Sequence, residues 1–240
     1  PLEVHQKDYG PARDYLAQRA SDIPGLVGLY EHGSVAAPGI SDIDLIAVID
    51  KHVDRLEILW FLEGSNAPAH VTRVLDQGTI KPVSQPLFER INILGEISAR
   101  AIFPADAAPP SKLPEQQKLF VDVANVVDWL PERILMLRSL LSRPTLSCRR
   151  VLGGLGSFRH STSAVSRVLG YEPTESIEFS NAYDDLRANW FDQPESSNFQ
   201  ATVSLINSGV TSGRHLIETV TSRLLELGIF GENETIEGST

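Results

Sequence analysis

Two aspartates one residue apart, Asp42 and Asp44, constrain the fold of this chain more than any other feature. Successive side chains of a β-strand point to opposite faces, so the two carboxylates would share one face while Ile43 and Leu45 face a core. Two carboxylates held this close repel each other, and they stay ionised only where a cation neutralises the pair. Because hard oxygen ligands favour Mg²⁺ or Mn²⁺, the pattern predicts a divalent metal site on Asp42 and Asp44.

A second feature lies just upstream, where the segment 26–32, Leu-Val-Gly-Leu-Tyr-Glu-His, is typical of a strand and leads directly into Gly33 and Ser34. A Gly-Ser turn after a strand can present backbone N–H groups and a hydroxyl to a phosphate. The phosphate-binding turn and the metal pair would therefore belong to one site. The alternative is a surface hairpin whose aspartates face water, but it does not explain why apolar residues flank both aspartates and continue to Ile49.

The segments 29–34, Leu-Tyr-Glu-His-Gly-Ser, and 38–45, Pro-Gly-Ile-Ser-Asp-Ile-Asp-Leu, resemble the signature of the polymerase-beta-like nucleotidyltransferase superfamily. The Ser-Asp-Ile-Asp-Leu block is most similar to the minimal and antibiotic-modifying branches. The resemblance is specific over residues 25–50 and extends in layout to residue 105. An isolated Asp-x-Asp would be weak evidence, whereas the composite of strand, Gly-Ser and Asp-x-Asp is much more specific.

The resemblance implies a two-metal transfer of a nucleoside monophosphate, with ATP or another nucleoside triphosphate as donor. In that reading Asp42 and Asp44 hold Mg²⁺ or Mn²⁺ and are catalytic. Gly33, Ser34 and Ser41 contact the triphosphate. Pyrophosphate leaves, and an oxygen of the acceptor takes the nucleoside monophosphate.

A third carboxylate normally stands on a later strand in this superfamily, and the sequence leaves its position open. Asp76 is the best candidate and is the third expected catalytic residue. If the matching strand is 80–83 instead, the position falls on Thr79 or Lys81 and the third acid is missing. Glu89, in the following helix, is a poorer candidate.

The pattern of apolar residues predicts an α+β fold: an N-terminal nucleotidyltransferase domain over 1–108, with a small mixed sheet flanked by helices, and an all-α helical-bundle domain over 115–230. In the first domain we expect helices at 8–20, 53–62 and 86–100, and strands at 26–32, 43–49, 70–75, 79–83 and 101–103. Pro82 would confine the fourth strand to a sheet edge. A proline-rich segment, 107–114, separates the domains. Beyond it we expect helices at 115–142, 145–169, 176–191 and 198–228, with Pro131 kinking or splitting the first.

The helical half also carries residues that such a site could use. The resemblance implies that an acid there can serve as base for the acceptor hydroxyl, but the sequence does not distinguish among Asp128, Glu132, Glu178, Asp184 and Asp185. A group of basic residues could reach the triphosphate or form ion pairs on a solvated helix face: Arg149, Arg150, Arg159 and His160.

The charge of the chain narrows the choice of partners. Its 31 acidic residues outnumber 21 basic ones, for a net charge of −10, and no Lys/Arg-rich block is present. This argues against a long nucleic acid, which needs a basic surface, and favours a small-molecule acceptor or a protein partner.

The absence of a long apolar run or a secretory signal, together with a single cysteine, Cys148, leads us to expect a cytoplasmic protein with no membrane partner. A homodimer could form, since the resemblance implies that some relatives build the acceptor site between subunits.

Three functions fit these observations. The first is an enzyme that transfers AMP from ATP to a hydroxyl of a small molecule. The second is an enzyme that adenylylates a protein partner, like the antitoxin members of the superfamily, although those need no whole helical domain. The third is a non-catalytic binding or regulatory protein that keeps the fold but has lost the third acid, and Asp76 is the residue that would decide it.

Overall fold

The computed structural model describes residues 4–33, 35, 37–50, 67–75, 80–94, 97–142 and 148–228. Two compact units make up the chain, Pro1–Gln117 and Lys118–Thr240. The expected helix at 53–62 lies outside the described residues. Within the described residues, no helix combines the length and the apolar character that crossing a bilayer requires.

The first unit is built on a four-stranded mixed sheet in the order β3-β2-β1-β4. β1 (Leu26–His32) pairs antiparallel with β2 (Asp44–Ile49) and with β4 (Ala99–Phe103), while β3 (Ile80–Ser84) runs parallel to β2. The expected α+β class with a small mixed sheet is therefore confirmed. β3 lies at an edge, as Pro82 predicted, because proline has no N–H to donate to a further strand.

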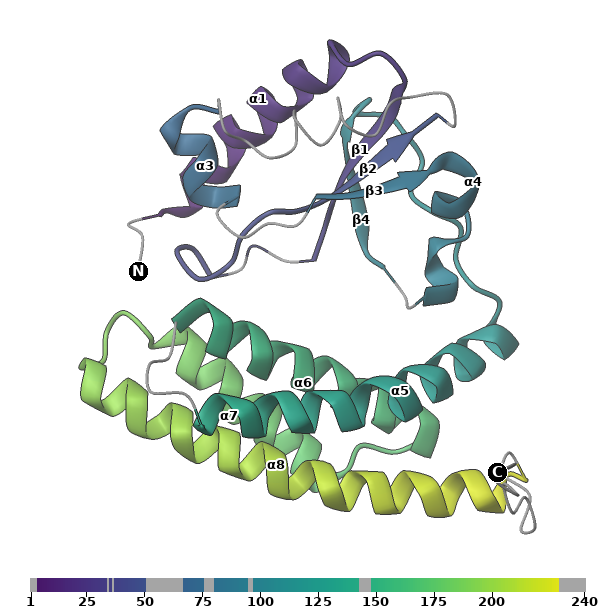
Figure 1. Ribbon diagram of the computed structural model, residues 1–240, viewed down its shortest axis with the longest axis vertical. Coiled ribbons are helices and arrows are strands. Elements are labelled where there is room, and N and C mark those ends of the chain that lie inside the picture. The colour runs from purple at the N-terminus through teal and green to yellow at the C-terminus, as the bar shows by residue number, and fades with distance from the viewer. Residues whose placement is uncertain are drawn as a thin grey trace, which may run out of the picture. The chain divides into compact units, whose positions relative to one another are not determined.

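Helices cover both faces of this sheet (Figure 1). A short 3₁₀ turn, η1 (Gln6–Asp8), leads into α1 (Tyr9–Ser21), which packs with α3 (Ala69–Leu75) on one face. The opposite face carries α4 (Gln85–Phe88) and the 3₁₀ helix η2 (Ile91–Leu94). The strand residues that face α1 and α3 are Leu26, Leu29, Leu45, Ala47 and Ile49. Those that face α4 and η2 are Tyr30, Ile46 and Val48. Along β2 the two sets alternate with the period of two expected of a strand, whereas a register shift between Leu26 and Gly28 interrupts the alternation in β1.

Two predicted elements of this unit were wrong. The segment 70–75 forms the helix α3 rather than a strand, because Val71 and Val74, three positions apart, are both fully buried beside α1. This helical spacing outweighs the strand preference of β-branched residues. The helix expected over 86–100 is also shorter, since α4 and η2 end by Leu94 and Ala99–Phe103 pairs with β1 instead.

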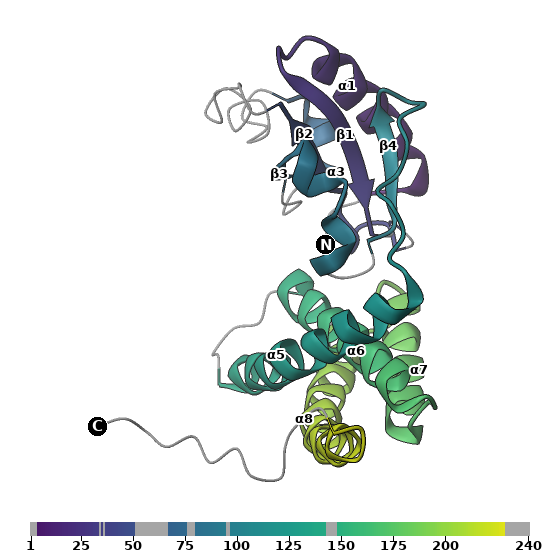
Figure 2. The same cartoon turned by 90° about the vertical axis from the view of Figure 1, so that its right-hand side faces the viewer.

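The second unit is helical: α5 (Glu115–Leu141), which starts just before the boundary, α6 (Cys148–Leu169), α7 (Thr174–Ala188) and α8 (Glu195–Glu226). Figure 2, which looks nearly along α8, shows the other three helices gathered beside it. Contacts join α6, α7 and α8 pairwise. The split expected at Pro131 does not occur, since α5 runs through this residue as one helix.

A glycine lets α8 approach α5 closely, which leads to a first prediction. A Cβ at Gly213 would lie 2.7 Å from Cγ1 of Ile134 and 3.0 Å from Cε2 of Phe158, too close for both to stay in place. Overpacking of this kind costs about 1–3 kcal/mol, and the better helix propensity of alanine returns only ~1 kcal/mol. Gly213→Ala should therefore lower the thermal midpoint of the helical unit, measured by circular dichroism.

A matched variant controls for helix propensity. Gly153, in α6, has open space where a Cβ would stand, with nothing within 4 Å. Gly153→Ala should therefore raise stability by up to ~1 kcal/mol. Equal shifts in the two variants would contradict the packing explanation.

Candidate functional site

The site predicted from the sequence lies where β1 ends and β2 begins. His32, the last residue of β1, pairs with Asp44, the first residue of β2. Gly33 follows with a φ of +83°, a conformation that favours glycine. A Cβ at Gly33 would lie 4.0 Å from Oδ2 of Asp44, so this carboxylate lies beside the backbone of the turn. Ser34 lies outside the described residues.

The two aspartates stand at the entrance to β2, and both are half-buried. Asp42 precedes the strand by two positions, and Ile43 and Leu45 are fully buried in the core shared with α1 and α3. Asp44 belongs to the opposite face of the sheet, the face of Ile46. The apolar residues around the acids are thus buried as predicted, and the carboxylate of Asp44 is directed away from that core.

Hydrogen bonds fix the loop that enters β2. The N–H of Ser41 donates to the carbonyl oxygen of Ala37 at 2.7 Å, and the N–H of Ala37 donates to Oγ of Ser41 at 3.2 Å. The hydroxyl of Tyr9 donates to the carbonyl oxygen of Ser41 at 2.7 Å, and the N–H of Ile43 donates to that of Val74 at 2.9 Å. Ser41 is buried, so its hydroxyl holds the loop in shape, and its contact with a phosphate stays a prediction.

A lysine and a histidine stand beside Asp44. Nζ of Lys81, from β3, lies 3.3 Å from Nε2 of His32. Burial lowers the pKa of His32, the ammonium of Lys81 lowers it further, and the carboxylate of Asp44 opposes them. The lowered pKa favours the uncharged imidazole, whose free nitrogen can accept a hydrogen bond from Lys81. Nothing in the sequence indicated the pairing of His32 with Lys81, which are 49 positions apart.

A third carboxylate is not found among the described residues of β3. The strand places Lys81 and Val83 on the face of Asp44, and neither is an acid. Asp76 and Thr79 lie outside the described residues, and Glu89 directly follows α4, where it is exposed. In the described part of the chain, no group of three His, Cys, Asp or Glu residues is arranged to hold a metal ion.

The donor set can nevertheless be tested against the metal that the resemblance implies. Two carboxylates, one in the loop before β2 and one at its first residue, supply hard oxygen ligands, which suit Mg²⁺ or Mn²⁺. Proteins often bind Mg²⁺ through only one or two carboxylates, with phosphate oxygens and water as the remaining ligands. Asp42 and Asp44 therefore fit one divalent cation bound together with a nucleotide.

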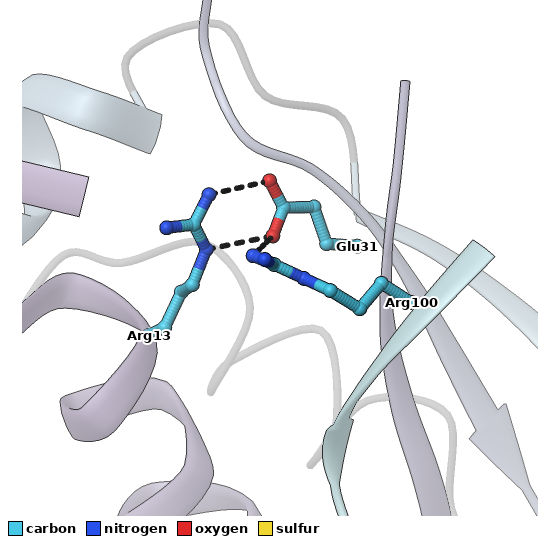
Figure 3. Close-up of polar contacts among 3 residues, drawn as sticks. All are labelled: Arg13, Glu31 and Arg100. Carbon is cyan, nitrogen blue, oxygen red and sulfur yellow. Dashed lines mark hydrogen bonds and ion pairs between the residues drawn. The ribbon is translucent and has the colours of Figure 1, made fainter. Parts of the chain in front are cut away.

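An ion-pair cluster that the sequence analysis missed lies on the other face of the sheet (Figure 3). Glu31, in β1, accepts hydrogen bonds from Nε and Nη2 of Arg13 at 2.7 and 2.8 Å, and another from Nη2 of Arg100 in β4. Its side chain is 7% exposed, against 21% for Arg13 and 62% for Arg100. An acid next to the apolar run 26–30 was the one available signal, because acids are rarely buried unless paired. The cluster ties α1, β1 and β4 together next to the His32–Gly33 turn.

Two of the candidates in the helical unit pair with each other. Nη2 of Arg159 lies 2.8 Å from Oδ2 of Asp184, so a residue suggested for phosphate binding pairs with one suggested as a base. This favours the alternative in which these charges form ion pairs on a helix face. Burial lowers the pKa of His160, and the charges of Arg159, Arg187 and Arg167 lower it further.

No protein family model, curated protein or solved structure matches this chain. A fold would not by itself identify an activity, since one fold supports many chemistries. Function must therefore be inferred from the residues of the site, above all Gly33, Asp42 and Asp44.

Proposed function

We propose that this chain is a metal-dependent nucleotidyltransferase that moves a nucleoside monophosphate, AMP from ATP, to a hydroxyl of a small-molecule acceptor. One observation carries the proposal: the carboxylate of Asp44 lies beside the backbone of Gly33, where β1 ends, with Asp42 two positions before it in the sequence. The resemblance of segments 29–34 and 38–45 to the nucleotidyltransferase signature supports the same reading.

Each residue of the proposed site would have a distinct role in binding the metal or the phosphates. Asp42 and Asp44 bind a divalent cation, Mg²⁺ or Mn²⁺, which when present neutralises charge on the phosphates. Gly33 leaves room for a phosphate to approach the backbone, because it has no Cβ. Ser34 donates its hydroxyl to a phosphate oxygen, and Ser41 keeps the loop in the shape that presents Asp42.

The reaction joins the acceptor oxygen to the α-phosphorus of the nucleoside triphosphate. The bond between that phosphorus and the bridging oxygen of the β-phosphate breaks, and pyrophosphate leaves with the electron pair. The proton of the acceptor hydroxyl passes to a base or to water. The net charge of −10 supports a small acceptor over a nucleic acid, because an acidic surface repels a long phosphate backbone.

Calorimetric titration tests whether the chain binds a nucleoside triphosphate together with Mg²⁺. ATP and GTP would be titrated into the wild-type chain and into Asp42→Asn, each with and without Mg²⁺. We expect Mg²⁺-dependent binding of ATP by the wild type, and affinity at least about tenfold weaker in the variant, because a charged metal ligand is lost. Absence of triphosphate binding, or binding that needs neither Mg²⁺ nor Asp42, would overturn the proposal.

A second candidate is a non-catalytic nucleotide-binding protein with a regulatory role. The observation in its favour is that the described part of β3 carries Lys81, rather than an acid, on the face of Asp44. Release of pyrophosphate from ATP, followed across a panel of hydroxylated acceptors, separates the two candidates. If the chain binds ATP with Mg²⁺ but none of the acceptors in the panel leads to release of pyrophosphate, the regulatory role is favoured.

A further inference from the structure

The strand order places the ammonium of Lys81 over the acidic end of β2. Lys81 is on β3 and His32 is on β1, and β2 lies between these two strands. A contact of 3.3 Å between Nζ and Nε2 therefore requires the lysine side chain to cross β2 on the face of Asp44. His32 is the register partner of Asp44, so the crossing is directed toward the end of β2 where the carboxylate stands.

The electrostatic environment of His32 agrees with this placement. Its imidazole interacts with the positive charge of Lys81 and with the negative charge of Asp44, so all three groups share one neighbourhood. Lys81 is exposed and Asp44 is half-buried, which leaves the ammonium accessible to a ligand. The positive charge of Lys81 thus stands near the carboxylate of Asp44, on the same face of the sheet.

We propose that the ammonium of Lys81 serves as the second positive charge of this site, beside a single divalent cation on Asp42 and Asp44, and that it binds a phosphate of the nucleotide. The inference rests on the proposed function and specifies how that site would hold its nucleotide. An ammonium is a compact point charge that suits phosphate oxygens. Its charge also disfavours a second divalent cation at the same place, since like charges repel. Nε2 of His32, 3.3 Å from the ammonium, would hold it in position.

Counting bound metal ions tests whether the site holds a single divalent cation. Bound Mn²⁺ would be measured by electron paramagnetic resonance with a saturating ATP analogue that carries a methylene bridge between the α- and β-phosphorus. We expect one Mn²⁺ per wild-type complex and two in Lys81→Asp, because that variant replaces the competing charge with a ligand. Two Mn²⁺ ions in the wild-type complex would overturn the inference.

Nucleotide affinity tests whether the ammonium of Lys81 binds a phosphate of the nucleotide. Lys81→Met should weaken binding of the same analogue in the presence of Mn²⁺ by roughly tenfold, the usual effect of losing one charged hydrogen bond. Lys81→Arg keeps the charge and should retain most of the affinity. Lys112→Met is the matched control, because Lys112 is exposed and lies outside the sheet, so its loss should change neither affinity nor metal count.

The outcomes separate this inference from the function on which it rests. Unchanged affinity in Lys81→Met, or an equal loss in Lys112→Met, would overturn the role of Lys81 while wild-type binding of Mn²⁺ and nucleotide would still support the site. A wild-type chain that binds neither Mn²⁺ nor the analogue would overturn both. Lys81 is exposed, so these variants should fold, which circular dichroism would verify.

Discussion

Asp44→Asn should reduce nucleotidyl transfer by a factor on the order of 1,000 while the chain stays folded. The substitution keeps the size of the side chain but removes the charge that would hold the divalent cation beside Gly33. Pyrophosphate release from ATP at saturating Mg²⁺, with an acceptor found by screening, measures the loss. Without metal, the variant should melt at the wild-type temperature or slightly above it, because replacing Asp44 removes its repulsion with Asp42.

The opposite end of the same strand offers a matched control. Asp50 follows β2 directly and is exposed, and only its backbone N–H forms a described hydrogen bond, to the carbonyl oxygen of Gly25. Asp50→Asn removes the same charge and should transfer at the wild-type rate. A wild-type rate in Asp44→Asn would falsify the site assignment. Equal losses in both variants would attribute the effect to net charge rather than to a metal ligand.

Local patterns predicted the centre of this site well. The strands at 26–32 and 43–49 follow from their runs of apolar residues and from the glycine that ends the first of them, and the structure pairs Asp44 with His32. The bounds of β1 match the prediction, and those of β2 differ from it by one residue. Periodicity succeeded here because each strand has one face set by the α1 and α3 core.

Contacts between distant segments could not be predicted in the same way. Lys81 and His32 are 49 positions apart, and their contact depends on the order and register of three strands. No local pattern encodes strand order, so the sequence left open whether β3 carries an acid or a lysine at the site. The strand predicted over 70–75 was wrong for a related reason. A short run rich in β-branched residues is compatible with a strand or a helix until its packing partner is known.

The second large effect is expected at Glu31, on the face of the sheet opposite the carboxylate of Asp44. Glu31→Gln should lower the free energy of unfolding of the first unit by about 2–3 kcal/mol at neutral pH. The glutamine cannot neutralise the guanidinium of Arg13, whose side chain is only 21% exposed. The expected cost lies below that of a fully buried pair because Arg100 is 62% exposed and water can replace its contact. Denaturation in urea, followed by circular dichroism, measures the change.

Glu89→Gln is the control for this loss, since it removes the same charge from an exposed residue directly after α4. Its effect should stay within about 0.5 kcal/mol. A comparable loss in both variants would show that overall charge, and not the cluster around Glu31, sets the stability of the unit.

At acidic pH the difference in the free energy of unfolding between the wild type and Glu31→Gln should become smaller. Burial alone would raise the pKa of Glu31, but the hydrogen bonds and charges of Arg13 and Arg100 outweigh it, and the pKa is lowered. The folded chain then binds fewer protons than the unfolded chain below the ordinary glutamate pKa, so this carboxylate stabilises the fold above that value. The stabilisation is lost as the pH falls through the lowered pKa. The wild type should therefore lose stability faster than Glu31→Gln between about pH 6 and about pH 3, and a constant difference over that range would contradict the ion-pair account.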